Sequence, residues 1–278
     1  MTRATARLAA AGVASPRVDA EILAAHVLGV NRGRLALVEG FTPQQAARYA
    51  DLIARRERRE PLQHLTGHAP FRHIELAVGP GVFIPRPETE LLVEWGLSWL
   101  RSHQVSAPVV VDLCAGTGAV GIAVATEWPG AVVYAVEQAP SALTWLHRNA
   151  AEAGSGGAAV SVVVGDATDP NVLPGLAGKV DLVLSNPPYV PVTTALSDEV
   201  AHDPAEALYA GPDGLEVIRP LIVTAARLLR PGGAFAVEHD DSHGEAVPEL
   251  LRAALGWSEV HDHRDLAGRP RFATAIRG

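Results

Sequence analysis

A short run of residues after an apolar stretch carries the most specific chemistry in this sequence. Residues 180–185 read Val-Asp-Leu-Val-Leu-Ser and lead directly into Asn186-Pro187-Pro188-Tyr189. Two prolines fix the backbone and remove two amide donors, so the loop presents carbonyl acceptors without competing N–H groups. The Asn186 side-chain oxygen and the Pro187 carbonyl can together accept both hydrogens of one –NH2 group. The Tyr189 ring offers a face on which a planar group can stack.

This pattern addresses a specific chemical problem. The nitrogen of an amide or of an aniline-like amine is a poor nucleophile, because its lone pair is delocalised. Accepting both hydrogens directs the nitrogen at a methyl donor and stabilises the positive charge that develops in the transition state. The proton can leave after transfer, so no general base with a shifted pKa is required. The alternative is a purely structural two-proline turn; together with the glycine loop described next, the pattern favours methylation of a planar –NH2 nitrogen.

A glycine loop follows the apolar stretch Val109–Leu113. Gly116, Gly118 and Gly121 fit G-x-G-x-x-G, a pattern of dinucleotide sites. In those sites the first glycine follows the strand directly, whereas here Asp112 stands at the strand end with three residues between it and Gly116. An acid at that place is poorly suited to a diphosphate but suits a ligand with an ammonium group, such as S-adenosylmethionine. Glycines required only for a tight turn are compatible with either ligand.

Two more acids end the next two predicted strands. Glu137 stands 19 residues after Gly118 and is placed to accept both ribose hydroxyls, which nicotinamide and S-adenosyl sites share. Asp166 follows the third strand and is placed to accept the adenine amino group. A single acid of this kind is often only a helix cap. Three in succession, Asp112 included, predict an adenosyl cofactor without naming the reaction.

These motifs require a parallel sheet to bring them together. Strands are predicted at 109–113, 132–136, 160–164, 180–184 and 234–237, and helices at 118–127, 140–153 and 214–229, before a last helix and strand that end near Ile276. Continuous apolar strands that alternate with helices indicate an α/β fold with a parallel sheet covered on both faces. Ligands of such sheets bind outside the carboxyl ends of the strands, where every motif above falls.

The first part of the chain differs in character. Residues 1–60 read as helices only, with Ser15-Pro16 and Thr42-Pro43 as helix starts and Gln45 placed to close a capping box. Residues 61–87 carry a short pair of strands with glycines and prolines between them. We therefore expect a helical domain (1–60), a β-hairpin connector (61–87) and a catalytic domain (88–278). No internal repeat is present.

Charge is divided unevenly along the chain. Residues 1–79 hold 11 basic and 7 acidic residues, a net +4, whereas residues 80–278 hold 12 and 24, a net −12. An acidic total argues against direct binding of nucleic acid, which needs a basic face. Four arginines close the helix that opens at Thr42, namely Arg55, Arg56, Arg58 and Arg59. They form either a solvated last turn or a contact surface for an acidic partner.

Composition excludes several classes of protein. A hydrophobic content of 48% with 19% charged residues excludes a disordered or fibrous chain. The single cysteine, Cys114, excludes an intramolecular disulfide and any thiolate cluster for zinc or iron–sulfur. No stretch reaches 18 uninterrupted apolar residues, and the start lacks the apolar segment of a secretory signal. We therefore expect a cytoplasmic protein without a membrane segment, and we expect it to be monomeric.

Several stretches make the chain resemble the release factor glutamine methyltransferases, the HemK/PrmC family, over nearly its whole length. Besides Asn186–Tyr189, the stretches that carry the resemblance are Phe83–Glu90, Asp112–Gly118, Gly211–Leu215 and Asp265–Arg271. The resemblance implies a small N-terminal helical domain and a seven-stranded, Rossmann-like, S-adenosylmethionine-dependent methyltransferase domain. It also implies methyl transfer from that cofactor to the N5 nitrogen of the glutamine in the Gly-Gly-Gln motif of class 1 peptide release factors.

The same resemblance assigns roles to residues. It implies that the loop Cys114, Ala115, Gly116, Thr117 and Gly118 lines the methionine part of the cofactor, with Glu137 at the ribose and Asp166 and Ala167 by the adenine. Asn186 touches both cofactor and substrate, Pro187, Pro188 and Tyr189 complete the glutamine pocket, and Asn186, Pro187 and Tyr189 are the catalytic residues. No metal ion is implied.

The chain departs from the family pattern at three places. The family usually has glycine where Cys114 stands, which puts a side chain near the cofactor. It often has a bulky residue where Ala167 stands, so the adenine pocket is expected to be looser. After Glu238 the family often has glycine and glutamine, where this chain has Asp240, Asp241 and His243. No role is assigned to that segment.

Other interpretations compete with this one. Histidines stand beside acids at 202–203, 238–243 and 261–263, as eleven histidines among 278 residues often do by chance. His261 and His263 alternate along a predicted strand and share one face of it, but no third ligand is evident, so no metal site is expected. Arg86 and Glu90 either order the cofactor pocket or pair with each other.

Three other functions use parts of the same sequence pattern. A DNA adenine N6-methyltransferase uses the same nitrogen chemistry on a flipped base, but it needs a basic cleft that the net −12 of residues 80–278 does not supply. A nicotinamide-dependent oxidoreductase is the second rival. The third is an inactive binding module for translation factors, against which the intact Asn186–Tyr189 run argues.

Overall fold

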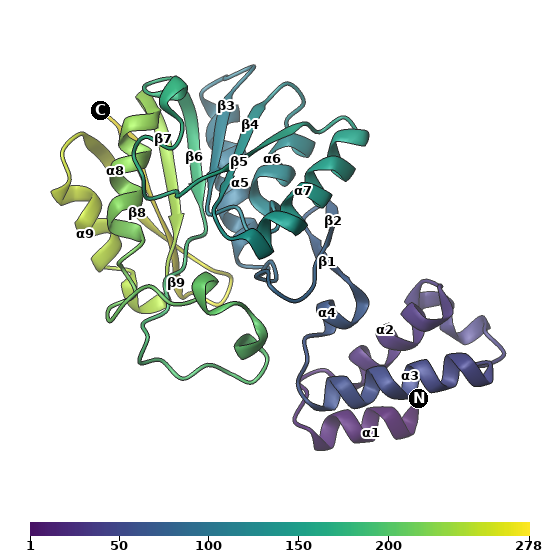
Figure 1. Cartoon of the computed structure of the whole chain (residues 1–278). Helices are drawn as coiled ribbons and strands as arrows, with labels where there is room; N and C mark the ends of the chain where they lie inside the picture. The colour runs from purple at the N-terminus through teal and green to yellow at the C-terminus, as the bar shows by residue number, and fades with distance from the viewer. The chain divides into compact units, whose positions relative to one another are not determined.

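The chain divides into two compact units. The computed structural model describes all residues, 1–278. One unit, called here the helical unit, comprises residues 1–68 with 78–80 and 196–202. The other, called here the sheet unit, comprises residues 69–77, 81–195 and 203–278. Figure 1 shows the helices of the first and the layered sheet of the second. No helix of the chain is long and apolar enough to cross a lipid bilayer.

Short helices form the helical unit. They are α1 (Thr2–Ala10), α2 (Pro16–Leu28), α3 (Pro43–Glu57) and α4 (Leu62–Thr66), with 3-10 turns η1 (Arg32–Leu37) and η3 (Val200–His202). The predicted capping box of α3 is confirmed, because Gln45 N donates to Thr42 Oγ1 at 3.3 Å and Thr42 N donates to Gln45 Oε1 at 2.9 Å. Ser15 stands at the N-cap of α2, but its side chain makes no capping bond. The core of this unit includes Leu8, Leu23 and Ile53.

One prediction made the arginines at the end of α3 an open basic contact surface. The structure does not show such a surface. The Arg56 side chain is only 5% exposed and donates to Asp19 at 2.7 Å and to Glu199 at 2.8 Å. The other pairs are Arg55 with Glu60 and Arg59 with Glu199. Only Arg58 is exposed. The prediction of a contact surface built from all four was wrong, because carboxylates pair with three of them: Glu60 close by in the sequence, and Asp19 and Glu199 far away.

The sheet unit holds the remaining elements. Its strands are β1 (His68–Phe71), whose first residue belongs to the helical unit, β2 (Ile74–Ala77), β3 (Val109–Leu113), β4 (Val132–Glu137), β5 (Val160–Val164), β6 (Val180–Ser185), β7 (Leu229–Glu238), β8 (Trp257–Arg264) and β9 (Pro270–Arg277). Its helices are α5 (Thr89–Ser102), α6 (Ala119–Glu127), α7 (Pro140–Ser155), α8 (Ile218–Leu228) and α9 (Ala246–Ala253), with 3-10 turns η2 (Pro174–Leu176), η4 (Ala205–Ala207) and η5 (Asp241–His243). The strand pair expected in residues 61–87 is present, as β1 and β2.

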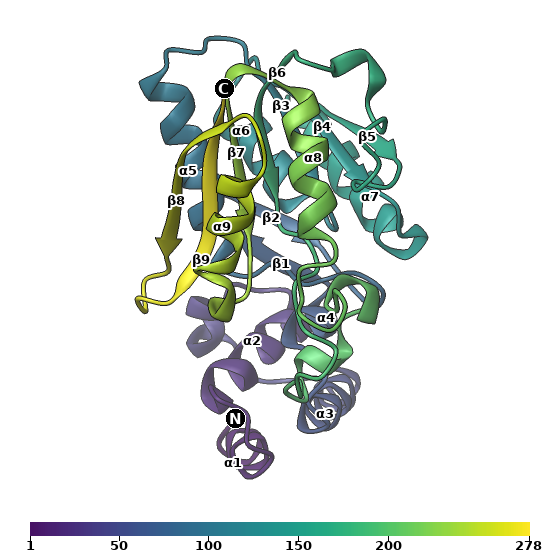
Figure 2. The ribbon, with the colours of Figure 1, turned by 90° about the vertical axis from the view of Figure 1, so that its left-hand side faces the viewer.

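A seven-stranded sheet is the centre of this unit, with strand order β5-β4-β3-β6-β7-β9-β8. The five strands from β3 to β7 are parallel, and β9 runs antiparallel between β7 and β8. Helices α5, α6 and α7 lie against one face and α8 and α9 against the other (Figures 1 and 2). The predicted α/β class is confirmed. The last strand predicted to end near Ile276 is present as β9, and the predicted strand that carries His261 and His263 is present as β8. Their antiparallel pairing was not predicted.

The parallel strands bring the predicted motifs to one edge of the sheet. Cα pairing sets Leu113 of β3 beside Val136 of β4 and Ser185 of β6, and Ser185 beside Val237 of β7. The carboxyl ends of these strands therefore meet. Their buried core includes Val111, Val183, Phe235 and Val237, with Leu221 and Leu251 from α8 and α9. This packed core holds the loops at the edge in fixed positions.

Candidate active site

Asp112 braces the glycine loop from inside the fold. It is 1% exposed, and its Oδ2 accepts from the Gly121 amide at 2.9 Å, which ties β3 to the first turn of α6. Its Oδ1 is buried without a hydrogen-bond partner. Burial raises the pKa of Asp112 to about 7. Asp112 therefore acts on the loop's shape and charge, rather than as an open ligand.

Glu137 organises the same loop from the neighbouring strand. Its Oε2 accepts from the Gly116 amide at 2.8 Å, and its Oε1 accepts from Gln138 N and Ala139 N, each at 2.8 Å. The carboxylate thus links the glycine loop to the start of α7. It is partly exposed, and each oxygen keeps lone-pair capacity for a further donor.

Cys114 adopts a backbone conformation that favours glycine. Its φ is +64°, in the left-handed region that costs a residue with a Cβ roughly 1–2 kcal/mol. Burial raises the pKa of the Cys114 thiol, and the charges of Glu137 and Asp112 raise it further. The thiol therefore stays protonated, and Cys114 is a packing residue of the loop. This explains why glycine in this position, as the family pattern has it, is the unstrained choice.

The residues expected near an adenine lie after β5. Asp166 is exposed, and its Oδ1 accepts from the amide and the hydroxyl of Thr168 at 2.8 and 2.7 Å. Ala167 is 5% exposed and belongs to the same core cluster as Leu113. The loop is therefore ordered by its own hydrogen bonds.

An adenosyl group with a cationic sulfur fits this set of residues. A Cβ built on Gly116 would meet nothing within 4 Å, so the space above that glycine is open. The side chains around it are acidic, and the buried Asp112 Oδ1 has no partner. Negative charge and an open approach to the loop backbone suit a cation and oppose a diphosphate.

Asn186 is held by a hydrogen bond that it donates to a helix distant in the sequence. Its Nδ2 donates to Thr89 Oγ1, at the start of α5, at 3.1 Å. With the nitrogen end occupied, the oxygen end of the amide is left as an acceptor. Pro187 is buried beside it. This orientation agrees with the acceptor role that the sequence predicts for Asn186 Oδ1, and that role stays a prediction.

Tyr189 is fixed at both ends. Its backbone amide and that of Val190 donate to the Leu208 carbonyl at 3.2 and 2.8 Å. Its hydroxyl donates to Glu238 Oε1, at the end of β7, at 3.0 Å. Burial raises the pKa of Tyr189 well above its usual value, and the Glu238 charge raises it further. Tyr189 is therefore a neutral ring of fixed orientation.

Glu238 is a buried acid that the sequence interpretation left without a role. It is 1% exposed, and burial raises its pKa to about 7 against the opposing effects of Thr89, Tyr189 and Arg271. Thr89 was likewise overlooked as an individual residue. Thr89 lies in the family stretch Phe83–Glu90, and Glu238 directly follows the predicted strand 234–237. These two positions in the sequence could have pointed to Thr89 and Glu238 as site residues.

The Gly211–Leu215 stretch lies directly against the loop that carries Tyr189. Gly214 has a φ of +73°, and a Cβ built on it would fall 2.8 Å from His243 Cε1 and closer still to the Tyr189 carbonyl oxygen. His243, to which no role was assigned, shares a 2.9 Å hydrogen bond between its Nε2 and the Asp213 carbonyl. The predicted helix at 214–229 begins only at Ile218, because this turn precedes it.

The Asp265–Arg271 stretch forms the turn between β8 and β9. Asp265 Oδ1 accepts from the amides of Ala267 and Arg269 at 2.9 and 3.0 Å. Its Oδ2 accepts from Arg271 Nη2 at 3.3 Å. This contact orients Arg271, whose charge acts on both Tyr189 and Glu238.

Arg86, Glu90 and one of the histidines that stand beside acids have partners in the structure that the sequence did not predict. Arg86 pairs with Asp203, and Glu90 accepts from the Arg72 amide at 3.0 Å, so Arg86 and Glu90 do not pair with each other, which was one of the two alternatives. His239 Nε2 lies 3.1 Å from Asp262 Oδ1. No group of three histidine, cysteine, aspartate or glutamate side chains is arranged to hold a metal ion.

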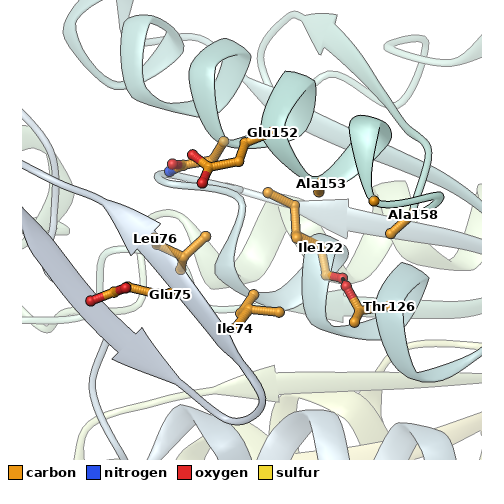
Figure 3. Close-up of a pocket in the computed structure, with 10 residues that line it drawn as sticks. Ile74, Glu75, Leu76, Ile122, Thr126, Glu152, Ala153 and Ala158 are labelled. Atoms are coloured by element: carbon orange, nitrogen blue, oxygen red, sulfur yellow. Dashed lines mark hydrogen bonds between the residues drawn. The ribbon is translucent and has the colours of Figure 1, made fainter.

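A cavity of about 230 Å³ lies elsewhere in the sheet unit, between β2, α6 and α7 (Figure 3). Its lining residues are Ile74, Glu75, Leu76, Ile122, Thr126, Asn149, Glu152, Ala153, Gly156 and Ala158, and none of them is a predicted site residue. Asn149 donates to the Thr117 carbonyl at 2.9 Å and to the Ala77 carbonyl at 3.1 Å. The wall of this cavity thus supports the glycine loop from behind.

Two family models match the chain. Residues 1–67 match the PrmC N-terminal domain, and residues 89–211 match the methyltransferase small domain.

Curated relatives match almost the whole chain. A release factor glutamine methyltransferase of Mycolicibacterium smegmatis is 52% identical over 99% of this chain and 95% of its own length. One of Streptomyces coelicolor is 50% identical over 99% and 96%, and one of Deinococcus radiodurans is 44% identical over 100% and 97%.

Solved structures support the fold. The hMettl16 catalytic domain in complex with the MAT2A 3'UTR hairpin 6 has a TM-score of 0.55 at 16% identity, over 85% of this chain and 82% of its own. The T. thermophilus 16S rRNA N2 G1207 methyltransferase in complex with AdoMet and guanosine has a TM-score of 0.53 at 22% identity, over 76% and 50%.

Proposed function

Since this chain belongs to the release factor glutamine methyltransferases, we propose that it methylates the side-chain N5 nitrogen of a glutamine in a release factor, with S-adenosylmethionine as methyl donor. The substrates are class 1 release factors, and the glutamine is that of their Gly-Gly-Gln motif. The observation that carries this proposal is the orientation of Asn186, whose Nδ2 is engaged by Thr89 so that Oδ1 is left to accept.

The cofactor is held at the glycine loop. Residues 114–118 line its methionine part, Glu137 binds the ribose, and Asp166 and Ala167 lie by the adenine. The open space above Gly116 and the acidic surroundings support this assignment. When bound, S-adenosylmethionine supplies a methyl group on a cationic sulfur.

The loop after β6 positions the substrate nitrogen. Asn186 Oδ1 and the Pro187 carbonyl accept the two hydrogens of the glutamine –NH2 group, and Pro188 and Tyr189 form the walls of the pocket. Holding both hydrogens aims the nitrogen lone pair at the methyl carbon and stabilises the positive charge that develops on nitrogen. The nitrogen loses its proton after transfer. Tyr189, anchored by Glu238, presents a fixed ring face to the planar amide.

The rival functions lack comparable support. The curated relatives are named as glutamine methyltransferases, so a DNA adenine methyltransferase is not favoured, and neither are an oxidoreductase or an inactive module. The net −12 of residues 80–278 agrees with a protein substrate rather than a nucleic acid.

The domains carry separate tasks in this proposal. Residues 1–60 dock the release factor, 61–87 connect, and 88–278 bind the cofactor and carry the reaction. The match of residues 1–67 to the PrmC N-terminal domain supports the first assignment. The enzyme acts as a monomer, without direct contact to nucleic acid, in the cytoplasm, where release factors work.

A transfer assay tests the proposal. Purified protein is expected to move radiolabel from S-adenosylmethionine to an unmodified release factor but not to duplex DNA. Labelling that persists after Gln→Ala in the Gly-Gly-Gln motif would show that the substrate assignment is wrong. In the enzyme, Asn186→Ala is expected to lower kcat by about 100-fold or more, since removing one oriented transition-state hydrogen bond has effects of this order. Cofactor affinity should fall much less, and turnover that survives the change contradicts the two-acceptor mechanism.

A further inference from the structure

Four polar side chains from three segments lie together beside the candidate active site: Asn186 and Tyr189 from the loop after β6, Thr89 from α5 and Glu238 from β7. Asn186 Nδ2 donates to Thr89 Oγ1 at 3.1 Å, and the Tyr189 hydroxyl donates to Glu238 Oε1 at 3.0 Å. Thr89 is 2% exposed and Glu238 is 1% exposed. Resting on the function proposed above, we propose that Thr89 is a positioning residue which, held by ionised Glu238, keeps the Asn186 amide turned with Oδ1 toward the substrate nitrogen.

Thr89 alone cannot decide which way the amide points. A hydroxyl is both a donor and an acceptor, so it can bond either the nitrogen or the oxygen end of an amide. If Thr89 donated to Asn186 Oδ1, the amide would present its –NH2 group to the substrate –NH2 group. Two donors would then face each other and no acceptor would remain. The useful orientation therefore requires that the Thr89 hydrogen be used elsewhere.

Glu238 provides that second acceptor. Its Oε1 already accepts from Tyr189, while its Oε2 is buried with no hydrogen-bond partner within the usual distance. The Thr89 hydroxyl faces this carboxylate closely enough to lower its pKa. An ionised carboxylate only accepts, so it draws both hydroxyl hydrogens toward itself. The Thr89 oxygen then has only its lone pairs to offer Asn186, and the amide must present Nδ2 to it.

The charge of Glu238 decides which groups donate and which accept in these hydrogen bonds. Tyr189 donates to Glu238, the Thr89 hydroxyl and Arg271 from β9 also favour its charged form, and Glu88, just before α5, opposes it. Burial raises its pKa to about 7, so it changes charge in the neutral range. Protonated Glu238 can itself donate to Thr89, which frees the Thr89 hydrogen for Asn186 Oδ1. The correct amide orientation is therefore favoured above this pH and lost below it.

The first test compares two replacements of Thr89. Thr89→Val keeps the shape but removes the hydroxyl, and its kcat on a release factor should fall about 10- to 100-fold, as for loss of one buried hydrogen bond. The KM for the release factor and the Kd for S-adenosylmethionine should change little. Thr89→Ser should restore turnover. Wild-type turnover in Thr89→Val, or equal loss in Thr89→Ser, overturns the proposal.

Thr224 supplies a matched control. It is a threonine with 0% exposure in α8, and its Oγ1 has no hydrogen-bond partner. Thr224→Val makes the same replacement in an equally buried place and should leave kcat unchanged. An equal loss in Thr224→Val would show that the effect of Thr89→Val is a general response of the core, which also overturns the proposal.

The second test uses pH. Wild-type kcat should rise with pH through about 7, following ionisation of Glu238, and this rise should disappear in Thr89→Val and in Glu238→Gln. If the pH profile of Thr89→Val matches that of the wild type, Thr89 does not couple the ionisation of Glu238 to turnover. A Thr89 with a merely structural role would leave the pH profile unchanged in this way.

A third measurement does not depend on turnover. The side-chain amide signals of Asn186 in nitrogen-15 NMR, assigned by their absence in Asn186→Ala, should show slowed hydrogen exchange in wild type and Thr89→Ser but not in Thr89→Val. If the proposed function is wrong but the positioning role is right, the wild-type protein will transfer no methyl group to a release factor while hydrogen exchange at the Asn186 amide stays slow. Equal exchange in all three proteins refutes the positioning role.

Discussion

Replacing Gly214 by alanine should disable the enzyme without unfolding it. Gly214 has a φ of +73°, and a Cβ placed there falls 2.8 Å from His243 Cε1 and closer still to the Tyr189 carbonyl oxygen. Carbon and oxygen atoms in favourable contact lie about 3.3–3.6 Å apart. The loop of Asn186–Tyr189 and the turn 211–215 must therefore separate by an amount on the order of 1 Å, as these contact distances require.

Two effects follow, and they differ in kind. The left-handed backbone costs alanine roughly 1–2 kcal/mol of stability. Displacement of the loop moves the acceptors of the substrate –NH2 group, and a misplacement of about 1 Å can lower a rate about 100-fold. We therefore expect kcat for release factor methylation in Gly214→Ala to fall about 100-fold, with cofactor affinity nearly unchanged.

Gly178 separates these two effects. It has a φ of +68°, and a Cβ built on it meets nothing within 4 Å. Gly178→Ala should lose a comparable part of its stability through the backbone, roughly 1–2 kcal/mol, yet keep wild-type kcat. Single-turnover methylation and urea unfolding measured on both variants decide the matter. A folded Gly214→Ala that turns over within twofold of wild type refutes the reasoning.

Two further predictions concern buried charge. Arg56→Ala leaves Asp19 buried without its partner, so it should lower the free energy of unfolding, measured in urea, by about 3–5 kcal/mol. Arg58→Ala, on the surface, should change this free energy by no more than about 0.5 kcal/mol. Equal effects of the two substitutions would contradict the assignment of Arg56 as a buried ion-pair residue. Burial raises the pKa of Asp112 from its ordinary value of 3.8 to about 7, so between these pH values the folded protein holds a proton that the unfolded chain has lost. The contribution of Asp112 to stability therefore falls as pH rises through that window, by at most about 1.4 kcal/mol per pH unit. Asp112→Asn should lack this slope, and parallel curves of melting temperature against pH for the two proteins would show that Asp112 does not titrate there.

Prediction from the sequence is most direct where local rules apply. Asn186–Tyr189 and the glycine loop were recognised because the residue types and their spacing carry the chemistry directly. The parallel strands followed from continuous apolar runs, and the capping box of α3 followed from residues three apart. Each of these inferences uses neighbours along the chain.

Prediction failed where the partner of a charged residue lies far away. A pair of Arg86 with its neighbour Glu90 was one of two alternatives, yet Arg86 binds Asp203. The arginines at the end of α3 were interpreted as open to solvent or to a partner, yet Arg56 and Arg59 share Glu199. A long arginine reaches whichever carboxylate the fold brings near, and sequence spacing says nothing of that carboxylate when it stands over 100 residues away.

By itself, the sequence determined which side chains stand at the carboxyl ends of the parallel strands, because strand and helix patterns fix that order. Only the tertiary structure decided how those side chains are held. Thr89 and Asn186 stand 97 residues apart, and their hydrogen bond exists because α5 and β6 belong to the same packed unit. Burial of Glu238, which raises its pKa to about 7, likewise arises from the elements around it. Hydrogen-bond direction and burial are properties of three-dimensional neighbours, which residue type and spacing do not encode.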